Sequence, residues 1–477
     1  MSLPAAWAES WRAAPSGAVV RDVGGTWLDG ATMLERTARV AGRLSGAGLR
    51  AADRVVISGE ASADLVVAHC AALRLGLVVM PVNSAYSQRE IDVLVGIGGP
   101  KAALVERDEM RAWMPDGMVV AGVDVDLPDS HPPPMDEVSA GDPAMLAFTS
   151  GTTGTPKGVV LSHGNLLSSA EAVRIAWHWQ PTDTLILCLP LFHMHGLGVG
   201  VHGTLLTGAA MILQRGFDPE VVLSACDEAT MFFGVPTMYT RLAEAPGAER
   251  LGSLRLCVSG SAPLSAELHN RIRERTGQAV LERYGMTETV MLVSNPYDRE
   301  RRPGTVGVPL PGVELRLDPA TSEILVKGPN VFRGYLDQPD ATTAAFTDDG
   351  FFRTGDVGEF DDDGYLRIVG RAKELIISGG YNVYPREVED VLRSHPAVVD
   401  AAVVGTPSDE WGEIVTAYVE ANEGFDPAEL LEFASKHLAP YKKPRIVHRV
   451  DALPRNRMGK VQRDQLKPKT AEGPKVA

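Results

Sequence analysis

Short runs rich in valine, isoleucine and leucine alternate with longer helical patterns along most of the chain, and this alternation limits the possible folds more than any other feature. A helical pattern near residues 61–75, for example, stands between two such runs. The clearest runs are residues 54–59 (RVVISG), 77–82 (LVVMPV), 184–192 (TLILCLPLF) and 254–260 (LRLCVSG). Strands separated by helices predict a largely parallel sheet that is buried on both faces. We therefore expect an α/β fold for residues 15–370.

The pattern changes at residues 361–373 (DDDGYLRIVGRAK), which combine an acidic turn, one short strand and a charged run. The chain beyond this stretch predicts strands at 375–378, 399–404, 414–420 and 445–450, and helices at 385–394 and 427–438. Pro385 is typical of the first turn of a helix. These features predict a large N-terminal domain, residues 1–370, and a small α+β C-terminal domain, residues 371–477. The tail from about Lys467 is expected to be disordered.

Composition excludes several classes of function. The net charge of −15 disfavours broad binding to nucleic acid or to acidic membranes, which both need a positive surface. No apolar run is long enough to predict a transmembrane helix, and the first residues lack the features of a signal peptide, so we expect a cytoplasmic protein. The 4 cysteines form no C-x-x-C pair, which predicts neither a zinc site nor a disulfide framework.

Residues 149–158 (TSGTTGTPKG) form a loop of hydroxyls, glycines and one lysine directly after an apolar run. Such a loop can surround phosphate oxygens with backbone N–H groups, while Lys157 adds positive charge. It is not a Walker motif, because Pro156 and Gly158 occupy positions where glycine and serine or threonine are required. The alternative interpretation is a flexible Ser/Gly loop.

A second glycine pattern, Gly198-x-Gly200-x-x-Gly203, fits the dinucleotide-binding fingerprint by its letters. Residues 192–195 (FHMH) stand between the preceding run and these glycines. The tight turn from strand to helix that the fingerprint requires is therefore not predicted.

The loop at 149–158 resembles the phosphate loop of the adenylate-forming superfamily, which includes acyl-CoA synthetases, peptide-synthetase adenylation domains and firefly-type luciferases. Further segments resemble the signatures of that superfamily in the same order: 189–198, 259–265, 282–289, 353–356, 364–371, 377–389 and 454–460. The resemblance implies an enzyme that uses ATP and Mg²⁺ to join a carboxylic acid to coenzyme A (CoA) through an acyl-adenylate, releasing AMP and pyrophosphate. It also implies that the small C-terminal domain is a mobile lid.

The same resemblance implies roles for individual residues around ATP. The implied nucleotide-binding residues are Thr149, Ser150, Gly151, Thr152, Thr153, Gly154, Thr155, Lys157, Ser261, Ala262, Pro263, Glu282, Tyr284, Gly285, Met286, Thr287, Asp356 and Arg371. Thr287 would lie near the α-phosphate, and Glu288 would be a magnesium ligand, since a hard oxygen suits this ion. Asp356 would accept hydrogen bonds from the ribose, and Arg371 would reach the ribose or a phosphate. The alternatives are a carboxylate at a helix start, an aspartate in a turn and a surface salt bridge, respectively.

Residues near the C-terminus have implied roles in the lid. Lys460 would bridge the α-phosphate and the carboxylate during adenylation, as a point charge on a flexible stem. Lys373 corresponds to the hinge of the superfamily. After rotation of the lid, a thin tunnel for the pantetheine of CoA would be lined by Ser378, Gly379 and Gly380, where glycines leave room.

The acid itself is indicated by Arg283, at the edge of the acyl pocket that the resemblance implies, with Ser261 and His193. Alternation along the strand predicted at 278–285 puts Arg283 on the face opposite Glu282, which therefore cannot easily neutralise it. A second carboxylate on the substrate could pair with the guanidinium. His193 or His195 would stand at the gate of this pocket, unless they are ordinary packed histidines, and Arg283 could instead face solvent or a distant acid.

Residues 294–314 are similar to the malonyl-CoA synthetase branch of the superfamily. We therefore expect the product to be malonyl-CoA, with methylmalonyl-CoA if the pocket has room for a methyl group. The alternative is a ligase for short- or medium-chain fatty acids or aryl acids. A luciferase-like oxygenase shares these motifs, and a stand-alone adenylation enzyme is possible because no carrier domain follows Lys460.

Overall fold

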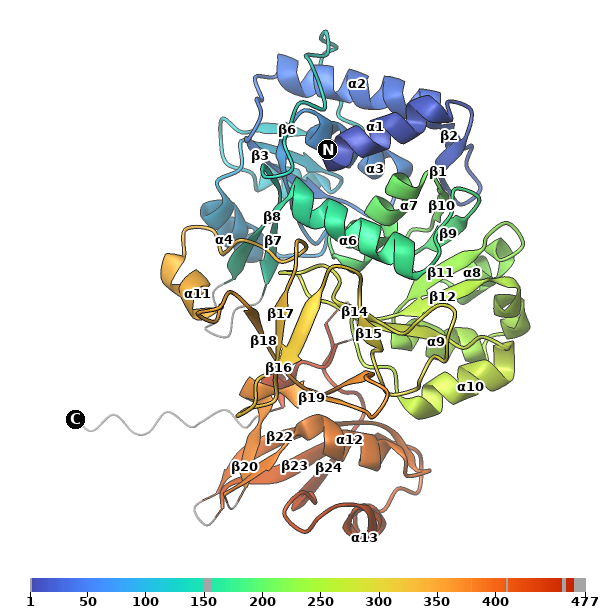
Figure 1. The fold of residues 1–477 in the computed structure, drawn as a ribbon, viewed down its shortest axis with the longest axis vertical. Helices are drawn as coiled ribbons and strands as arrows, with labels where there is room; N and C mark the ends of the chain where they lie inside the picture. The colour runs from blue at the N-terminus through green and yellow to red at the C-terminus, as the bar shows by residue number, and fades with distance from the viewer. Residues whose placement is uncertain (1, 150–155, 379, 409–410, 457–459, 467–477) are drawn as a thin grey trace, which may run out of the picture.

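The computed structural model describes residues 2–149, 156–378, 380–408, 411–456 and 460–466 (Figure 1). The tail from Lys467, predicted to be disordered, lies outside the described residues. The N-terminal part contains a mainly parallel sheet with the strand order β6-β5-β3-β4-β7-β8, in which only β8 runs antiparallel to its neighbour. Its strands are β3 (Arg54–Ser58), β4 (Val78–Pro81), β5 (Ala102–Val105), β6 (Val119–Ala121), β7 (Pro143–Thr149) and β8 (Lys157–Ser162).

A longer sheet has the order β15-β14-β13-β12-β11-β9-β10-β1-β2 and is parallel from β13 to β1. Its strands are β1 (Ala18–Asp22), β2 (Leu28–Asp29), β9 (Thr184–Leu187), β10 (Ala210–Leu213), β11 (Met231–Gly234), β12 (Leu256–Ser259), β13 (Leu281–Tyr284), β14 (Val293–Ser294) and β15 (Val308–Pro309). The carboxyl ends of β12 and β13 lead into the loops that carry the predicted nucleotide-binding residues Ser261, Ala262, Pro263, Gly285, Met286 and Thr287. Parallel strands often hold ligands at this edge.

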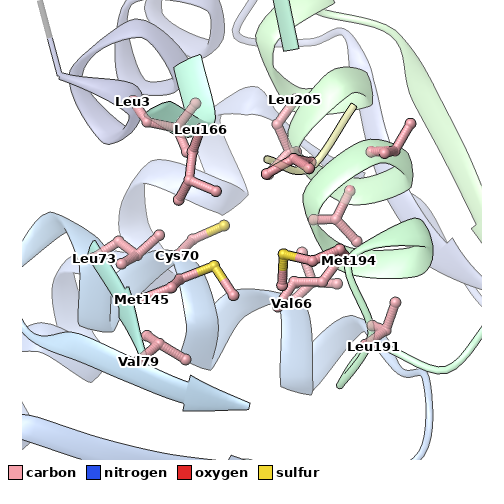
Figure 2. Close-up of a cluster of buried hydrophobic side chains, with 14 of the residues drawn as sticks. Leu3, Val66, Cys70, Leu73, Val79, Met145, Leu166, Leu191, Met194 and Leu205 are labelled. Atoms are coloured by element: carbon pink, nitrogen blue, oxygen red, sulfur yellow. The ribbon is translucent and has the colours of Figure 1, made fainter. Parts of the chain in front are cut away.

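Helices cover both sheets, and the buried hydrophobic residues form one large cluster with members from both sheets and two smaller clusters, one for each sheet. The helices of the N-terminal part are α1 (Leu3–Ala13), α2 (Gly30–Gly46), α3 (Ala63–Arg74), α4 (Gln88–Gly98), α5 (Asp108–Ala112), α6 (His163–Ala176), α7 (His202–Thr207), α8 (Pro219–Ala225), α9 (Pro236–Glu244), α10 (Ala266–Thr276) and α11 (Pro339–Ala344). Every residue of α3 except Asp64 is buried, as expected of a helix that is apolar on all sides and packed centrally. Figure 2 shows Val66, Cys70 and Leu73 of α3 facing Met145 and Leu205 within this core.

A third sheet is antiparallel, with the order β16-β17-β18-β19, and connects the large part of the molecule to the C-terminal sheet. Its strands are β16 (Glu314–Leu317), β17 (Glu323–Lys327), β18 (Phe352–Phe360) and β19 (Leu366–Arg371). The short turn η3 (Ala372–Glu374) then leads to the C-terminal sheet, whose order is β21-β20-β23-β22 with β24 beside β23. Figure 1 shows this sheet below β16–β19.

The C-terminal elements follow the sequence prediction closely. The strands are β20 (Ile376–Ser378), β21 (Tyr381–Val383), β22 (Val398–Ser408), β23 (Gly412–Ala421) and β24 (Ile446–Val450), and the helices are α12 (Pro385–Arg393) and α13 (Pro427–His437). The α/β class and the smaller C-terminal domain are therefore confirmed, while a boundary at residues 370 and 371 stays a prediction. The remaining short helical elements of the described residues are the π-helix η1 (His195–Val201) and the 3-10 helices η2 (Ala248–Ser253) and η4 (Arg463–Gln465).

Some expectations were incomplete. The region 15–370 holds more than one parallel sheet and also the antiparallel sheet β16–β19, which the alternation of strands and helices did not predict. The run at 184–192 forms a strand only to Leu187, and Pro190, which has no N–H to donate, lies in the following turn. Gly200 and Gly203 lie in helical turns against the side chains of Leu187 and Trp179. No helix in the described part of the chain is long and apolar enough to cross a membrane.

Candidate active site

The loop predicted to bind phosphate joins β7 and β8, whose end residues Thr149 and Lys157 are register partners. The Nζ atom of Lys157 lies 4.8 Å from the centre of the Tyr335 ring. The predicted contacts of Ser150, Gly151, Thr152, Thr153, Gly154 and Thr155 lie outside the described residues. The structure therefore describes only the two ends of the loop, where the lysine lies over an aromatic ring.

Glu288 lies in a turn between β13 and β14, not at the start of a helix, and is only 6% exposed. The Tyr335 hydroxyl donates a hydrogen bond to Oε1 of Glu288 at 3.2 Å. Burial raises the pKa of Glu288 although the charge of Arg371 is near. A buried hard oxygen whose charge is not fully compensated fits a divalent cation. The described residues contain no group of three or more His, Cys, Asp or Glu that could hold a metal, so Mg²⁺ here would be shared with nucleotide phosphates.

Asp356 lies in β18, buried at 4% exposure, opposite Arg371 of β19. The Tyr284 hydroxyl donates to Oδ2 of Asp356 at 2.5 Å, and Nε of Arg371 lies 3.0 Å from Oδ1. Each carboxylate oxygen therefore has one partner and keeps a second lone pair that a ribose hydroxyl could use. The side chain of Arg371 is 35% exposed and forms its ion pair within the site.

Lys460 comes from the C-terminal domain but shares its electrostatic surroundings with the N-terminal residues. Its charge interacts with those of Arg371, Asp356 and Glu374, and it also acts on His193. Loss of hydration lowers the pKa of Lys460 to about 8, although the residue keeps contact with solvent. Lys460 therefore lies within electrostatic range of the Asp356–Arg371 pair, and its role in adenylation stays a prediction.

His193 and His195 lie where the chain enters η1, which is a short π-helix, a feature often found at functional sites. His195 is 1% exposed, and its Nδ1 atom lies 3.2 Å from Oγ of Ser261. The backbone N–H of His195 donates to Nδ1 of His193 at 3.2 Å. Burial lowers the pKa of His193 to about 4 and that of His195 well below its usual value. Both imidazoles are therefore neutral at pH 7.

Arg283, in β13, is 6% exposed. Its Nε and one terminal nitrogen, Nη2, have no hydrogen-bond partner among the described residues. The guanidinium lies against Gly260, where an added Cβ would stand 2.4 Å from Nε. Burial lowers the pKa of Arg283 to about 9, so it stays charged at neutral pH. No ion pair joins Arg283 to Glu282 among the described residues, and the Glu282 carboxylate accepts from the backbone N–H of Leu264 at 3.0 Å.

The remaining predicted residues divide into two groups. Ala262 and Pro263 follow Ser261 in the loop after β12, and after β13 come Gly285, Met286 and Thr287. A side chain at position 285 would collide with the backbone oxygen of Val290 at 2.1 Å, so the main chain is tightly packed there.

The other group lies in the C-terminal domain. Ser378 and Gly380 belong to the hairpin β20–β21, Lys373 lies exposed in η3, and Gly379 is outside the described residues. Figure 1 shows β20 well below β17 and β18. In this structure the hairpin therefore lies apart from the other predicted site residues.

Sequence reasoning missed Gly260 and Tyr335. Gly260 lies within the segment 259–265 that signals the superfamily, so its position was marked but its role beside Arg283 was not. Tyr335 is 47 residues from Glu288 in the sequence, and no local pattern connects them.

Known proteins resemble this chain over most of its length. The profile of the AMP-binding enzyme family matches residues 7–336, and that of the AMP-binding enzyme C-terminal domain matches residues 387–460. A feruloyl-CoA synthase of Amycolatopsis sp is 37% identical over 477 residues, covering 96% of each chain. The mitochondrial malonate–CoA ligase ACSF3 of Mus musculus is 38% identical over 375 residues, 68% of this chain and 64% of the other. The crystal structure of ATP-bound MatB from Rhodopseudomonas palustris superposes with a TM-score of 0.92 at 41% identity, over 98% of both chains.

Proposed function

Since the chain belongs to the family of AMP-binding enzymes and is an AMP-forming ligase that joins an acid to CoA through an acyl-adenylate, we propose that its acid is malonate. Methylmalonate is a second substrate if the pocket has room for a methyl group. The observation that carries this proposal is the buried, charged guanidinium of Arg283. Both curated relatives are named for forming CoA thioesters, which favours a ligase over a luciferase-like oxygenase or a stand-alone adenylation enzyme.

Arg283 favours a dicarboxylate substrate for an electrostatic reason. A buried charge without a partner is unfavourable by several kcal/mol, on the order of the loss measured when a buried ion pair is broken. A fatty or aryl chain beside Arg283 would leave that charge without a partner. The second carboxylate of malonate can instead accept from Nε and a terminal nitrogen at once. The neighbouring His193 and His195 are neutral and add no competing positive charge.

In the first half-reaction, the malonate carboxylate attacks the α-phosphorus of ATP, and pyrophosphate leaves. Negative charge spreads over the phosphoryl oxygens, so positioned cations and hydrogen-bond donors lower the barrier. Lys460 and the Thr287 hydroxyl stabilise this charge, while Asp356 and Arg371 orient the ribose. Mg²⁺, when bound, neutralises charge on the phosphates, and the residue of this chain that would hold it is Glu288.

In the second half-reaction, the CoA thiolate attacks the carbonyl of the adenylate, and AMP leaves. This step requires no covalent intermediate on the enzyme. We place the hinge at Lys373, in the short turn that joins β19 to β20, with the domain boundary near residues 370 and 371. Rotation there would bring the hairpin of Ser378 and Gly380 toward the adenylate to line the pantetheine path.

An aryl acid is the competing substrate, because feruloyl-CoA synthase is similar across 96% of both chains. The two proposals are separated by assaying AMP formation, with and without CoA, on malonate, methylmalonate, butyrate and ferulate. We expect the wild-type enzyme to prefer malonate. Preference for butyrate or ferulate over malonate would contradict the dicarboxylate proposal.

Replacing Arg283 with alanine tests the same proposal at the residue that carries it. Arg283→Ala should weaken malonate use by about 2–5 kcal/mol in transition-state terms, which is about 30-fold or more in kcat/KM. Butyrate should lose far less. Arg301→Ala is a matched control, because Arg301 is partly buried and donates to the backbone oxygen of Ala279. Its effect should be equal for all acids, and an equal loss for all acids in Arg283→Ala would instead indicate a structural role.

A further inference from the structure

Residues 329–336 form a connecting segment that is fixed to both halves of the phosphate site. At one end, the backbone N–H of Phe332 donates to the carbonyl oxygen of Glu288 at 2.8 Å. At the other end, the N–H of Leu336 donates to the carbonyl oxygen of Gly158 at 2.8 Å, next to Lys157. Tyr335 itself forms an isolated bridge with Val159 of β8. A single stretch of backbone thus links the end of the phosphate loop to the Glu288 turn.

Side-chain amides hold this segment in place from both sides. Asn330 donates to the carbonyl oxygens of Thr289 and Met291 at 2.9 and 2.7 Å. Asn165 of α6 donates to the carbonyl oxygens of Pro329 and Val331 at 2.8 and 2.9 Å. These four bonds join the segment to α6 and to the turn that follows Glu288, so the segment is rigidly positioned.

The side chain of Tyr335 contacts the two groups that the segment connects. Its hydroxyl donates to Oε1 of Glu288 at 3.2 Å, and its ring lies 4.8 Å from the Lys157 ammonium. The ring is itself fixed by an edge contact with Phe332, with the centres 4.9 Å apart. We propose that Tyr335 is a positioning residue, which orients Glu288 toward the metal of Mg-ATP and holds Lys157 ready for the phosphates.

The two contacts have different physical effects. The hydrogen bond fixes one oxygen of the Glu288 carboxylate and leaves the other oxygen available to a cation, and such outer partners commonly tune metal affinity. The ring attracts the ammonium through its negative face. Without the ring, Lys157 and Glu288 would be free to approach each other and form a direct ion pair, which would compete with both the cation and the phosphates.

This inference rests on the proposed role of Glu288 as a magnesium ligand, and it is independent of the acid that the enzyme uses.

The test is equilibrium binding of ATP by calorimetry, with Mg²⁺ titrated or with EDTA present. Tyr335→Phe removes the hydroxyl and keeps the ring. The Mg²⁺ concentration for half-maximal ATP binding should rise by about tenfold or more, while binding in EDTA stays as in wild type. In turnover, kcat should fall with little change in the KM for the acid.

Tyr335→Leu also removes the ring, so ATP binding should weaken in EDTA as well as in Mg²⁺. Tyr365→Phe is the matched control, because Tyr365 also donates to an oxygen, the carbonyl of Glu300 at 2.9 Å, and has a cation, Arg302, 4.3 Å from its ring centre. The control should bind Mg-ATP as wild type does. Unchanged Mg²⁺ dependence in Tyr335→Phe, with or without a loss of thermal stability, would overturn the inference.

Glu288→Gln separates this inference from the proposal on which it rests. If Glu288→Gln raises the Mg²⁺ requirement and Tyr335→Phe does not, Glu288 is a metal ligand that Tyr335 does not position. If neither variant changes the Mg²⁺ requirement, the metal role of Glu288 itself is wrong, and the inference falls with it.

Discussion

The side chain of Lys460 gains or loses its positive charge within the ordinary working range of pH. Loss of hydration lowers its pKa to about 8, so the ammonium is present below that pH and is lost as the pH rises through it. Adenylation requires the charged form. We therefore expect kcat/KM for ATP, measured by pyrophosphate release, to fall above about pH 8. In Lys460→Arg, whose guanidinium stays protonated, the residual activity should show no such decline. A decline shared by both enzymes would assign the titration to another group.

Removing the charge altogether tests its role in each half-reaction. Lys460→Ala should slow adenylate formation by about 100-fold to 1,000-fold, the usual loss when one preorganised charge stabiliser is removed. Thioester formation from supplied acyl-adenylate should be unaffected, because in that step the thiolate attacks the carbonyl carbon and nothing attacks the α-phosphorus. Equal losses in both steps would argue against a lid that uses Lys460 only for adenylation.

Gly260 determines where the Arg283 guanidinium can lie. A Cβ at this position would be 2.4 Å from Nε, so Gly260→Ala should push the guanidinium away from its present place. Overpacking of this kind typically costs about 1–3 kcal/mol, and here the cost should appear in kcat/KM for malonate. Gly96→Ala is the control, since nothing lies within 4 Å of the added atom. If Gly260→Ala lowers malonate and butyrate use equally, the glycine does not act through Arg283.

At the scale of elements, the proposed hinge is the turn η3 between β19 and β20, where a change in backbone angles would reorient the C-terminal sheet. Lys373→Pro restricts φ at this point and should block thioester formation while leaving ATP–pyrophosphate exchange largely intact. Lys373→Ala, which keeps the backbone free, should perform both half-reactions. Normal CoA transfer by the proline variant would place the hinge elsewhere.

At the scale of the whole molecule, buried histidines make stability sensitive to acid. His69 and His202 lie with their Nε2 atoms 2.9 Å apart, and the charge of His163 would act on both. Burial lowers the pKa of His69 to about 3 and that of His163 to about 4. The unfolded chain binds these protons near pH 6.5 and the folded chain does not, so stability is lost as the pH falls below about 6.5.

The expected slope is at most about 1.4 kcal/mol per pH unit for each such histidine. The melting temperature should therefore fall between pH 7 and pH 5, and it should fall less in His163→Leu. His131, which is exposed, provides the control variant His131→Leu. Equal acid sensitivity in wild type and His163→Leu would mean that carboxylates, and not His163, govern this range.

Sequence information was sufficient where the signal is local. The runs at 54–59 and 254–260 predicted β3 and β12, because a buried parallel strand needs apolar residues on both faces. The segment that begins at Pro385 predicted α12, because proline fits the first turn of a helix. The loop at 149–158 and the segment around Glu288 predicted the ligase chemistry through their resemblance to the adenylate-forming superfamily, whose signatures are local in the sequence.

Only the tertiary structure decided which distant residues meet. The sequence singled out Arg283, but whether an arginine in a strand is solvated or buried depends on strands and loops far along the chain, and only the structure shows its guanidinium buried against Gly260. The division into separate sheets, and the contact of Tyr335 with both Glu288 and Lys157, likewise arise from non-local pairing. Local periodicity indicates which side of an element is apolar, but it does not indicate which other element covers that side. The packing of the whole chain decides which elements meet.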